Sequence, residues 1–146
     1  MKAVNVDIRR LIPQRDPIMM VDTLTEVDED SGVALTHLTV RADNFFIHRD
    51  GLLSECGLIE HIAQSASAFA GYKALSTSGT DNPPKGLIGE VKRFNCHRRP
   101  ALGETLDTTI TFGIEVAGVT LLTGETRVNG ELIADARMKI AVIGSE

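Results

Sequence analysis

The longest regular pattern of apolar positions lies near the middle of the chain, over residues 54–75. Placed at 100° per residue, Leu58, Ile62 and Phe69 fall on one side, with several alanines beside them. A narrow stripe of polar or small residues interrupts this surface at Glu60, Gln64, Ser67 and Gly71. Ser54 precedes the pattern and is a favourable N-cap. We therefore predict one long, largely buried helix, with Glu60 inside or at the edge of the packed core.

Patterns typical of strands occur on both sides of this helix. Six segments carry them: 17–28, 33–40, 86–97, 104–116, 119–128 and 131–143. The pairs Ala117-Gly118 and Asn129-Gly130 separate the last three segments, and Asn-Gly is the strongest hairpin signal in the chain. No repeat or linker divides residues 1–146, so we expect a single domain. The order of elements predicts an α+β fold, in which a curved antiparallel sheet wraps one long central helix.

Composition and charge argue against several functions. The chain has fifteen Lys and Arg and twenty Asp and Glu, which gives a net charge of −5, and it contains no basic run. We therefore expect no nucleic acid partner. The start of the chain is charged and no apolar stretch reaches membrane-spanning length, so we expect a soluble cytoplasmic protein. Cys56 and Cys96 are interpreted as free thiols. The cysteines and four histidines lack metal-ligand spacing, so no metal is expected.

Four short motifs punctuate the chain. They read LIPQRDPIMMVD at 11–22, FFIHRDG at 45–51, EHIAQ at 60–64, and VKRF at 91–94 with RRP at 98–100 and GE at 103–104. In this order they resemble the motifs of the β-hydroxyacyl-acyl carrier protein dehydratases of fatty acid synthesis. Those motifs read LLPHRYPFLLVD, FFxxHFPG, EAMAQ, and VRFRRP with a following GD. The resemblance covers most of the chain and implies the hotdog fold.

The resemblance also implies a reaction, the removal of water from 3-hydroxyacyl-acyl carrier protein thioesters. The product is a trans-2-enoyl thioester for fatty acid, related lipid or polyene synthesis. Such a reaction needs a base for the proton next to the carbonyl and an acid for the departing hydroxyl. The resemblance maps the base onto His48 and the acid onto Glu60, with Gln64 orienting the carboxyl. We expect burial to keep the Glu60 carboxyl protonated, because the helix dipole fades after the first turn. Candidate positioning groups for the thioester carbonyl are the backbone N–H groups of Gly51, Cys56 and Gly57.

The loop before the helix departs from the family pattern. His48 and Glu60 stand two positions closer than in the family, and Arg49-Asp50 replaces its Phe-Pro. The shortened loop either delivers His48 to the site or leaves it in solvent. The alternative for Glu60 and Gln64 is a purely structural role, in which Gln64 forms a hydrogen bond with a neighbouring strand. We interpret His61 as structural. Asp43 is a reserve acid, since residues 43–48 also resemble the Asp-x-Asn-Pro-Leu-His of enoyl-CoA hydratases.

Partners follow from the expected fold, which leaves sheet edges and an apolar helix flank uncovered. We expect at least a homodimer, with His48 of one chain facing Glu60 of the other. The resemblance implies acyl carrier protein as a partner and no cofactor beyond its phosphopantetheine. Its candidate contacts are Lys92, Arg93, Arg98 and Arg99. Two alternatives remain open: a hydratase or thioesterase acting on acyl-CoA, and a non-catalytic hotdog subunit that forms a hetero-oligomer with an active dehydratase.

Overall fold

One long helix occupies the centre of the molecule. The computed structural model describes residues 1–79 and 85–143. Helix α1 (Glu55–Ser78) begins after Ser54, whose side chain accepts a hydrogen bond from Gly57 N–H at 3.0 Å. It ends at Gly79, whose φ of 69° is left-handed. The predicted helix and its N-cap are confirmed, and the helix continues three residues past the predicted end.

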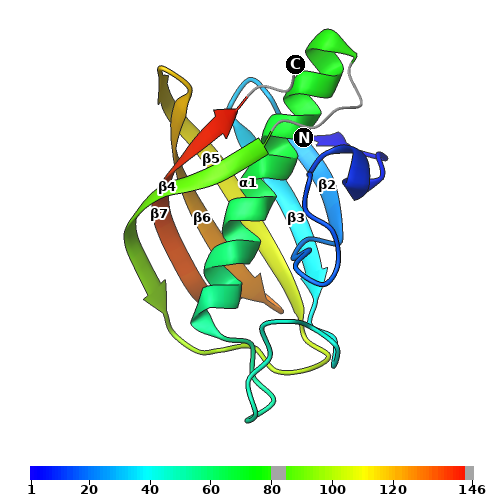
Figure 1. Cartoon of the computed structure of the whole chain (residues 1–146), viewed down its shortest axis with the longest axis vertical. Coiled ribbons are helices and arrows are strands. Elements are labelled where there is room, and N and C mark those ends of the chain that lie inside the picture. The colour runs from blue at the N-terminus through cyan, green and yellow to red at the C-terminus, as the bar shows by residue number, and fades with distance from the viewer. Residues whose placement is uncertain (80–84, 144–146) are drawn as a thin grey trace.

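A single antiparallel sheet wraps this helix (Figure 1). In the described residues its strands are β1 (Lys2–Ala3), β2 (Thr23–Asp28), β3 (Val33–Thr39), β4 (Lys85–Cys96), β5 (Thr105–Val116), β6 (Val119–Val128) and β7 (Glu131–Ile143). Their order across the sheet is β1-β2-β3-β5-β6-β7-β4, which places β4 at one edge. Helix α1 contacts every strand from β2 to β7. The predicted α+β arrangement is confirmed.

The two predicted hairpin turns are present. Asn129 and Gly130 have φ values of 50° and 83°, and Ala117 and Gly118 have values of 52° and 79°. Positive φ at both central residues matches the twist of the strands on either side, which is why Asn-Gly is favoured there. These turns pair β5 with β6 and β6 with β7.

The predicted strand over 17–28 is wrong in its first half, because β2 begins only at Thr23. The preceding 11–20 segment packs along α1 instead. Its backbone at Ile18 and Met20 forms hydrogen bonds with helix side chains rather than with a neighbouring strand. A short 3-10 helix, η1 (Ile8–Arg10), leads into this segment. Strand β1 was not predicted, since its two residues are too few to show a pattern.

Close packing around α1 depends on two glycines. A Cβ on Gly71 would lie 2.0 Å from the backbone oxygen of Leu11, and one on Gly124 would lie 2.6 Å from Cγ2 of Ile62. The 11–20 segment and strand β6 therefore approach closer than a larger residue would allow. No helix in residues 1–79 and 85–143 combines the length and the apolar character needed to cross a membrane.

Candidate active site

The carboxyl group of Glu60 faces a small cavity beside α1. This Glu60 cavity has a volume of about 230 Å³ and lies between the helix, the 11–20 segment and strands β4 and β7. Its lining residues are Gln14, Ile18, Glu60, Ala63, Gln64, Ser67, Ile88 and Ile140. Glu60 is partly buried and is the one ionisable residue in this lining. Glu60 is therefore the candidate acid or base of this cavity.

Gln64 lies one helical turn after Glu60 and is almost completely buried. Its Nε2 donates a hydrogen bond to Glu60 Oε1 at 2.9 Å and another to the Ile18 carbonyl at 2.8 Å. Its Oε1 accepts a hydrogen bond from Met20 N–H at 2.6 Å. The amide therefore contacts both the expected carboxyl and the 11–20 segment. That it orients Glu60 for catalysis stays a prediction.

His61 is fully buried on a different side of α1 from the Glu60 cavity. Its Nδ1 lies 2.6 Å from the Met20 carbonyl oxygen, and its Nε2 lies 2.7 Å from Thr108 Oγ1. Burial lowers the pKa of His61 to about 4, so the ring is neutral near pH 7. Because a carbonyl only accepts, Nδ1 carries the proton and Nε2 accepts from the Thr108 hydroxyl.

His48 lies on the loop before α1, and its side chain is exposed. It borders the His48 pocket, an open hollow of about 570 Å³ lined by Phe45, Phe46, His48, Ser54, Glu55, Cys56 and Arg99. Glu60 is absent from this lining, just as His48 is absent from the lining of the Glu60 cavity. Within one chain the proposed base and acid therefore line separate hollows. Asp43, the reserve acid, lines a third pocket with Asp22 and Arg41.

Two of the three candidate backbone donors are engaged within the chain. Gly51 N–H donates to the His48 carbonyl at 3.0 Å, in a turn where Gly51 has a φ of 79°. Gly57 N–H donates to the N-cap Ser54. A Cβ on Gly57 would lie 2.6 Å from Cβ of Phe46, so this glycine is required for packing. Cys56 N–H belongs to the first helical turn, whose amides have no partner within the helix, and Cys56 lines the His48 pocket.

The four candidate cations divide into two pairs. Arg99 donates to Asp50 at 2.8 Å and to the carbonyls of Leu52 and Leu53, which fastens the His48 loop to the connection between β4 and β5. These Arg99 hydrogen bonds are the largest cause that lowers the pKa of Asp50. Arg98 binds Glu104 through two hydrogen bonds of 2.8 and 3.0 Å. Lys92 and Arg93 are exposed on β4, the edge strand, where Arg93 Nε lies 3.9 Å from Asp135 Oδ1.

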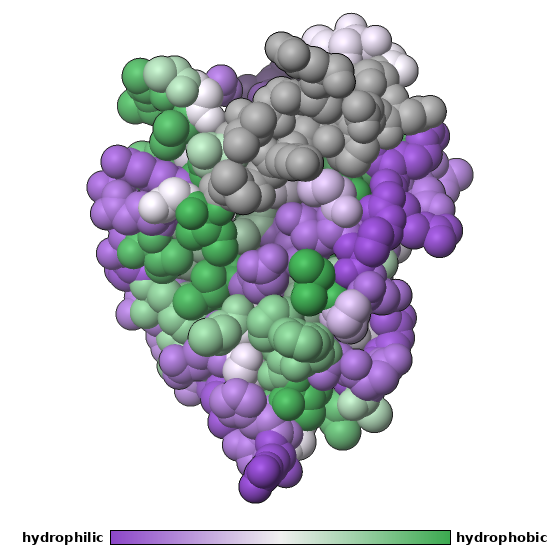
Figure 2. All heavy atoms as spheres, viewed as in Figure 1, coloured by the Kyte–Doolittle hydropathy of each residue, from purple (hydrophilic) through white to green (hydrophobic). Residues whose placement is uncertain are grey.

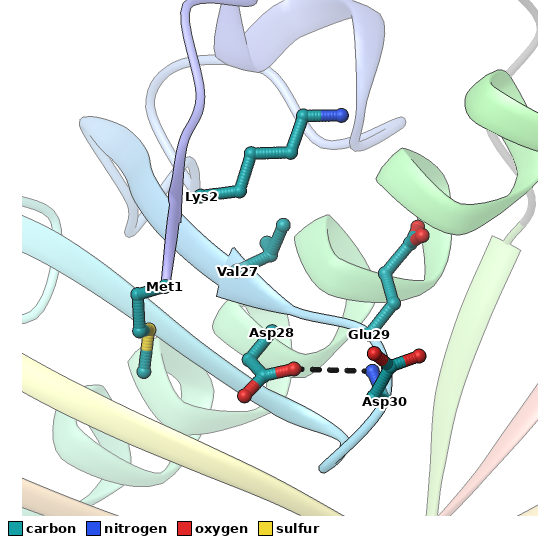
Figure 3. A pocket seen from close by; sticks show the side chains of 6 residues that line it. All are labelled: Met1, Lys2, Val27, Asp28, Glu29 and Asp30. Carbon is teal, nitrogen blue, oxygen red and sulfur yellow. Dashed lines mark hydrogen bonds between the residues drawn. The ribbon is translucent and has the colours of Figure 1, made fainter.

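Another hollow (Figure 3) lies at the opposite end of the domain from the His48 loop (Figure 1). Met1, Lys2 and Val27 line it with the carboxylates of residues 28–30. Asp28 Oδ1 accepts from Asp30 N–H at 3.2 Å, which closes a turn. No predicted site residue lies there. In the described part of the chain no three His, Cys, Asp or Glu side chains form a group that could hold a metal ion.

Comparison with known proteins assigns the family. A model of the ApeP-like family, described as ApeP dehydratase, matches residues 6–143. The chain belongs to the ApeP-like dehydratase family. It is 30% identical to the 3-hydroxyacyl-[acyl-carrier-protein] dehydratase FabZ of Cereibacter sphaeroides, over 88% of this chain and 83% of that protein. It is 25% identical to FabZ of Sinorhizobium medicae, over 96% of this chain and 90% of that protein.

A solved structure shares the fold of this ApeP-like dehydratase. A chain of the dehydratase heterocomplex ApeI:P from Xenorhabdus doucetiae superposes with a TM-score of 0.87 at 18% identity, covering 97% of this chain and 94% of that one. The dehydratase family inferred from four motifs is thereby confirmed, together with the hotdog arrangement.

Sequence reasoning about this ApeP-like dehydratase missed Gln14. Its Oε1 is buried without a hydrogen-bond partner in the described structure, and the residue lines the Glu60 cavity. An unpaired buried acceptor costs about 1–3 kcal/mol, so it is unusual in a native interior. The signal lay in the first motif, where Gln14 replaces the histidine of the family pattern.

Proposed function

We propose that this dehydratase removes water from 3-hydroxyacyl chains carried on acyl carrier protein, with His48 as base and Glu60 as acid. The observation that carries the proposal is the Glu60 cavity, where one carboxyl lies beside apolar side chains and receives an N–H from Gln64. The FabZ relatives are 3-hydroxyacyl-[acyl-carrier-protein] dehydratases, which supports this substrate class. Both cysteines are free, which suits a reducing compartment, and we place the reaction in the cytoplasm.

The reaction balances with these two groups. The neutral imidazole of His48 takes the proton from the carbon next to the thioester carbonyl, and that electron pair forms the new double bond. The bond from the third carbon to its oxygen breaks, while the Glu60 carboxyl gives its proton to the departing hydroxyl, which leaves as water. Proton transfer from the imidazolium to the carboxylate restores both groups. Cys56 N–H at the start of α1 is the remaining candidate to polarise the thioester carbonyl.

The site requires a second chain, because His48 and Glu60 line separate hollows in one chain. Strand β4 lies at the sheet edge beside the Glu60 cavity, and its Ile88 and Val91 are 39% and 37% exposed. Figure 2 shows apolar residues gathered over α1 and β4 on this face. An unpaired edge next to apolar surface favours pairing with another sheet. We propose that pairing along this edge brings His48 of one chain to Glu60 of the other.

The second chain is a copy of this chain or a related hotdog subunit. The Xenorhabdus structure is a dehydratase heterocomplex, and this observation favours the second arrangement. Lys92 and Arg93 lie exposed on the same strand, and we propose that they contact the acidic carrier protein.

The experiment is turnover of a 3-hydroxyacyl-acyl carrier protein by purified protein, followed by mass spectrometry as loss of water. His48→Ala and Glu60→Gln should each lower kcat by about 10²- to 10⁴-fold, the usual contribution of a general base or acid. The matched controls are His97→Ala and Glu125→Gln, at exposed positions outside both hollows, and they should retain wild-type rates.

Each other result points to a different conclusion. Wild-type rates in both site variants would refute the assignment of His48 and Glu60. Turnover of coenzyme A thioesters alone would show that the substrate is carried on coenzyme A and not on acyl carrier protein. Activity that appears only after a related hotdog subunit is added would show that the hetero-oligomer is the enzyme.

A further inference from the structure

We propose that His61 is a positioning residue of this dehydratase, which fixes the Glu60 carboxyl through Met20 and Gln64. The proposal rests on the proposed role of Glu60 as the acid. It changes the interpretation of His61, which the sequence places next to Glu60 but on another side of the helix. Three consecutive links join the sheet to the Glu60 carboxyl.

The first link anchors the His61 ring to the sheet. Its Nε2 lies 2.7 Å from the hydroxyl of Thr108 on β5, and that hydroxyl lies 2.8 Å from the hydroxyl of Thr126 on β6. All three side chains are buried. With Nε2 accepting from Thr108, the Thr108 oxygen is left to accept from Thr126. Thr126 therefore donates to Thr108, and Thr108 donates to Nε2 of His61. These two hydrogen bonds fix the orientation of the ring and place its proton on Nδ1.

The second link passes from His61 to the backbone of Met20. The Nδ1–H group donates to the Met20 carbonyl at 2.6 Å, while the Met20 N–H donates to Gln64 Oε1, also at 2.6 Å. His61 and Gln64 are three residues apart, which makes them neighbours on the helix surface. Both polar groups of one residue are thus held between two helix side chains. Met20 cannot shift without breaking a buried hydrogen bond.

The third link passes from Gln64 to Glu60. A glutamine amide carries its oxygen and its nitrogen on opposite sides, and here the oxygen faces the Met20 N–H. The amide nitrogen must then face Ile18 and Glu60. If Met20 moved, the amide could rotate and present its oxygen to Glu60, where it would accept the proton that the acid must deliver. His61 therefore affects the transition state more than substrate binding, so kcat should change and KM should not.

The test compares two substitutions, each of which keeps the contact made by only one of the two ring nitrogens. The amide of an asparagine lies near the position of Nδ1, so His61→Asn can keep a donor to the Met20 carbonyl. The amide of a glutamine lies nearer Nε2, so His61→Gln keeps a contact with Thr108 and leaves Met20 unpaired. We expect His61→Gln to lower kcat by about 10- to 100-fold with KM unchanged, the size of effect produced by a small misplacement of a reacting group. His61→Asn should restore kcat to within about threefold of wild type.

A second variant tests whether His61 acts through Gln64. In a Gln64→Leu background the amide is gone, so adding His61→Gln should lower kcat no further. Effects that multiply would show two independent roles and overturn the proposal. If His61→Gln is not recovered folded, Thr108→Val takes its place in this comparison with the same expectation, because it removes the anchor of the ring on β5.

Glu60→Gln, measured in parallel, distinguishes failure of the inference from failure of the proposed function. If Glu60→Gln is inactive while folded His61→Gln retains wild-type kcat, the inference is overturned and the proposed function stands. The same holds if His61→Asn and His61→Gln lower kcat equally. If Glu60→Gln retains wild-type kcat, the proposed function and the inference both fall.

Discussion

Replacing Gly71 by alanine perturbs the contact between α1 and the 11–20 segment. Gly71 lies within the helix, and an added Cβ would come 2.0 Å from the Leu11 carbonyl oxygen and 2.8 Å from its carbon. Ordinary contacts of a Cβ begin at 3.4 Å. The backbone of the segment must therefore move by roughly 1 Å, because the nearest atoms are backbone rather than the end of a flexible side chain.

Two opposing contributions set the magnitude. Overpacking of this kind costs about 3 kcal/mol, the upper part of the usual range, since the contact is with backbone. Alanine is favoured over glycine in a helix by about 1 kcal/mol. We expect Gly71→Ala to lower the free energy of unfolding by about 2 kcal/mol, which corresponds to a fall in Tm of about 4–8 °C for a chain of this size.

The assay is urea denaturation followed by circular dichroism. Ala74→Gly in the same helix calibrates the propensity contribution, because it makes the reverse exchange three residues further on. The segment that moves also carries Ile18 and Met20, so kcat should fall as well. A Gly71→Ala protein as stable as wild type, or more stable, would refute the close approach of the segment to α1.

Two further predictions concern pH and the carrier protein. The neutral, buried His61 has a pKa of about 4, so the unfolded chain binds one proton more than the folded chain between about pH 6.5 and 4. The free energy of unfolding therefore decreases as the pH is lowered through that range. Between pH 8 and 5 this loss is about 2 kcal/mol, and urea denaturation of His61→Asn should lack it; an unchanged pH dependence would contradict the burial. Lys92→Glu and Arg93→Glu should raise KM for the carrier-bound substrate but not for a pantetheine thioester, and equal effects on both would exclude a carrier contact.

Local signals were sufficient to predict most of the fold. The N-cap Ser54 and the helical periodicity located α1, and the Asn129-Gly130 pair located a hairpin. The same reasoning failed over residues 17–22. The N–H and carbonyl groups of Met20 form hydrogen bonds with Gln64 and His61, which lie more than forty residues away in the sequence. No local pattern reveals such partners.

For the site, the sequence gives candidate residues but not their geometry. The motifs indicated His48, Glu60 and Gln64, and the structure places the last two in contact. Within one chain His48 and Glu60 line separate hollows, and their meeting across a second chain stays a proposal. The N–H groups of Gly51 and Gly57 looked free in the sequence, but a tight turn and the N-cap of the helix engage them.

Mixing two inactive variants tests the shared site most directly. Equal amounts of His48→Ala and Glu60→Gln protein, allowed to exchange subunits, form mixed dimers as half of the population. Each mixed dimer holds one intact pair, made of His48 from one chain and Glu60 from the other. Turnover should return to about a quarter of the wild-type rate, while each variant alone stays inactive. A mixture of exchanged dimers no more active than its components would contradict a site built from two copies of this chain.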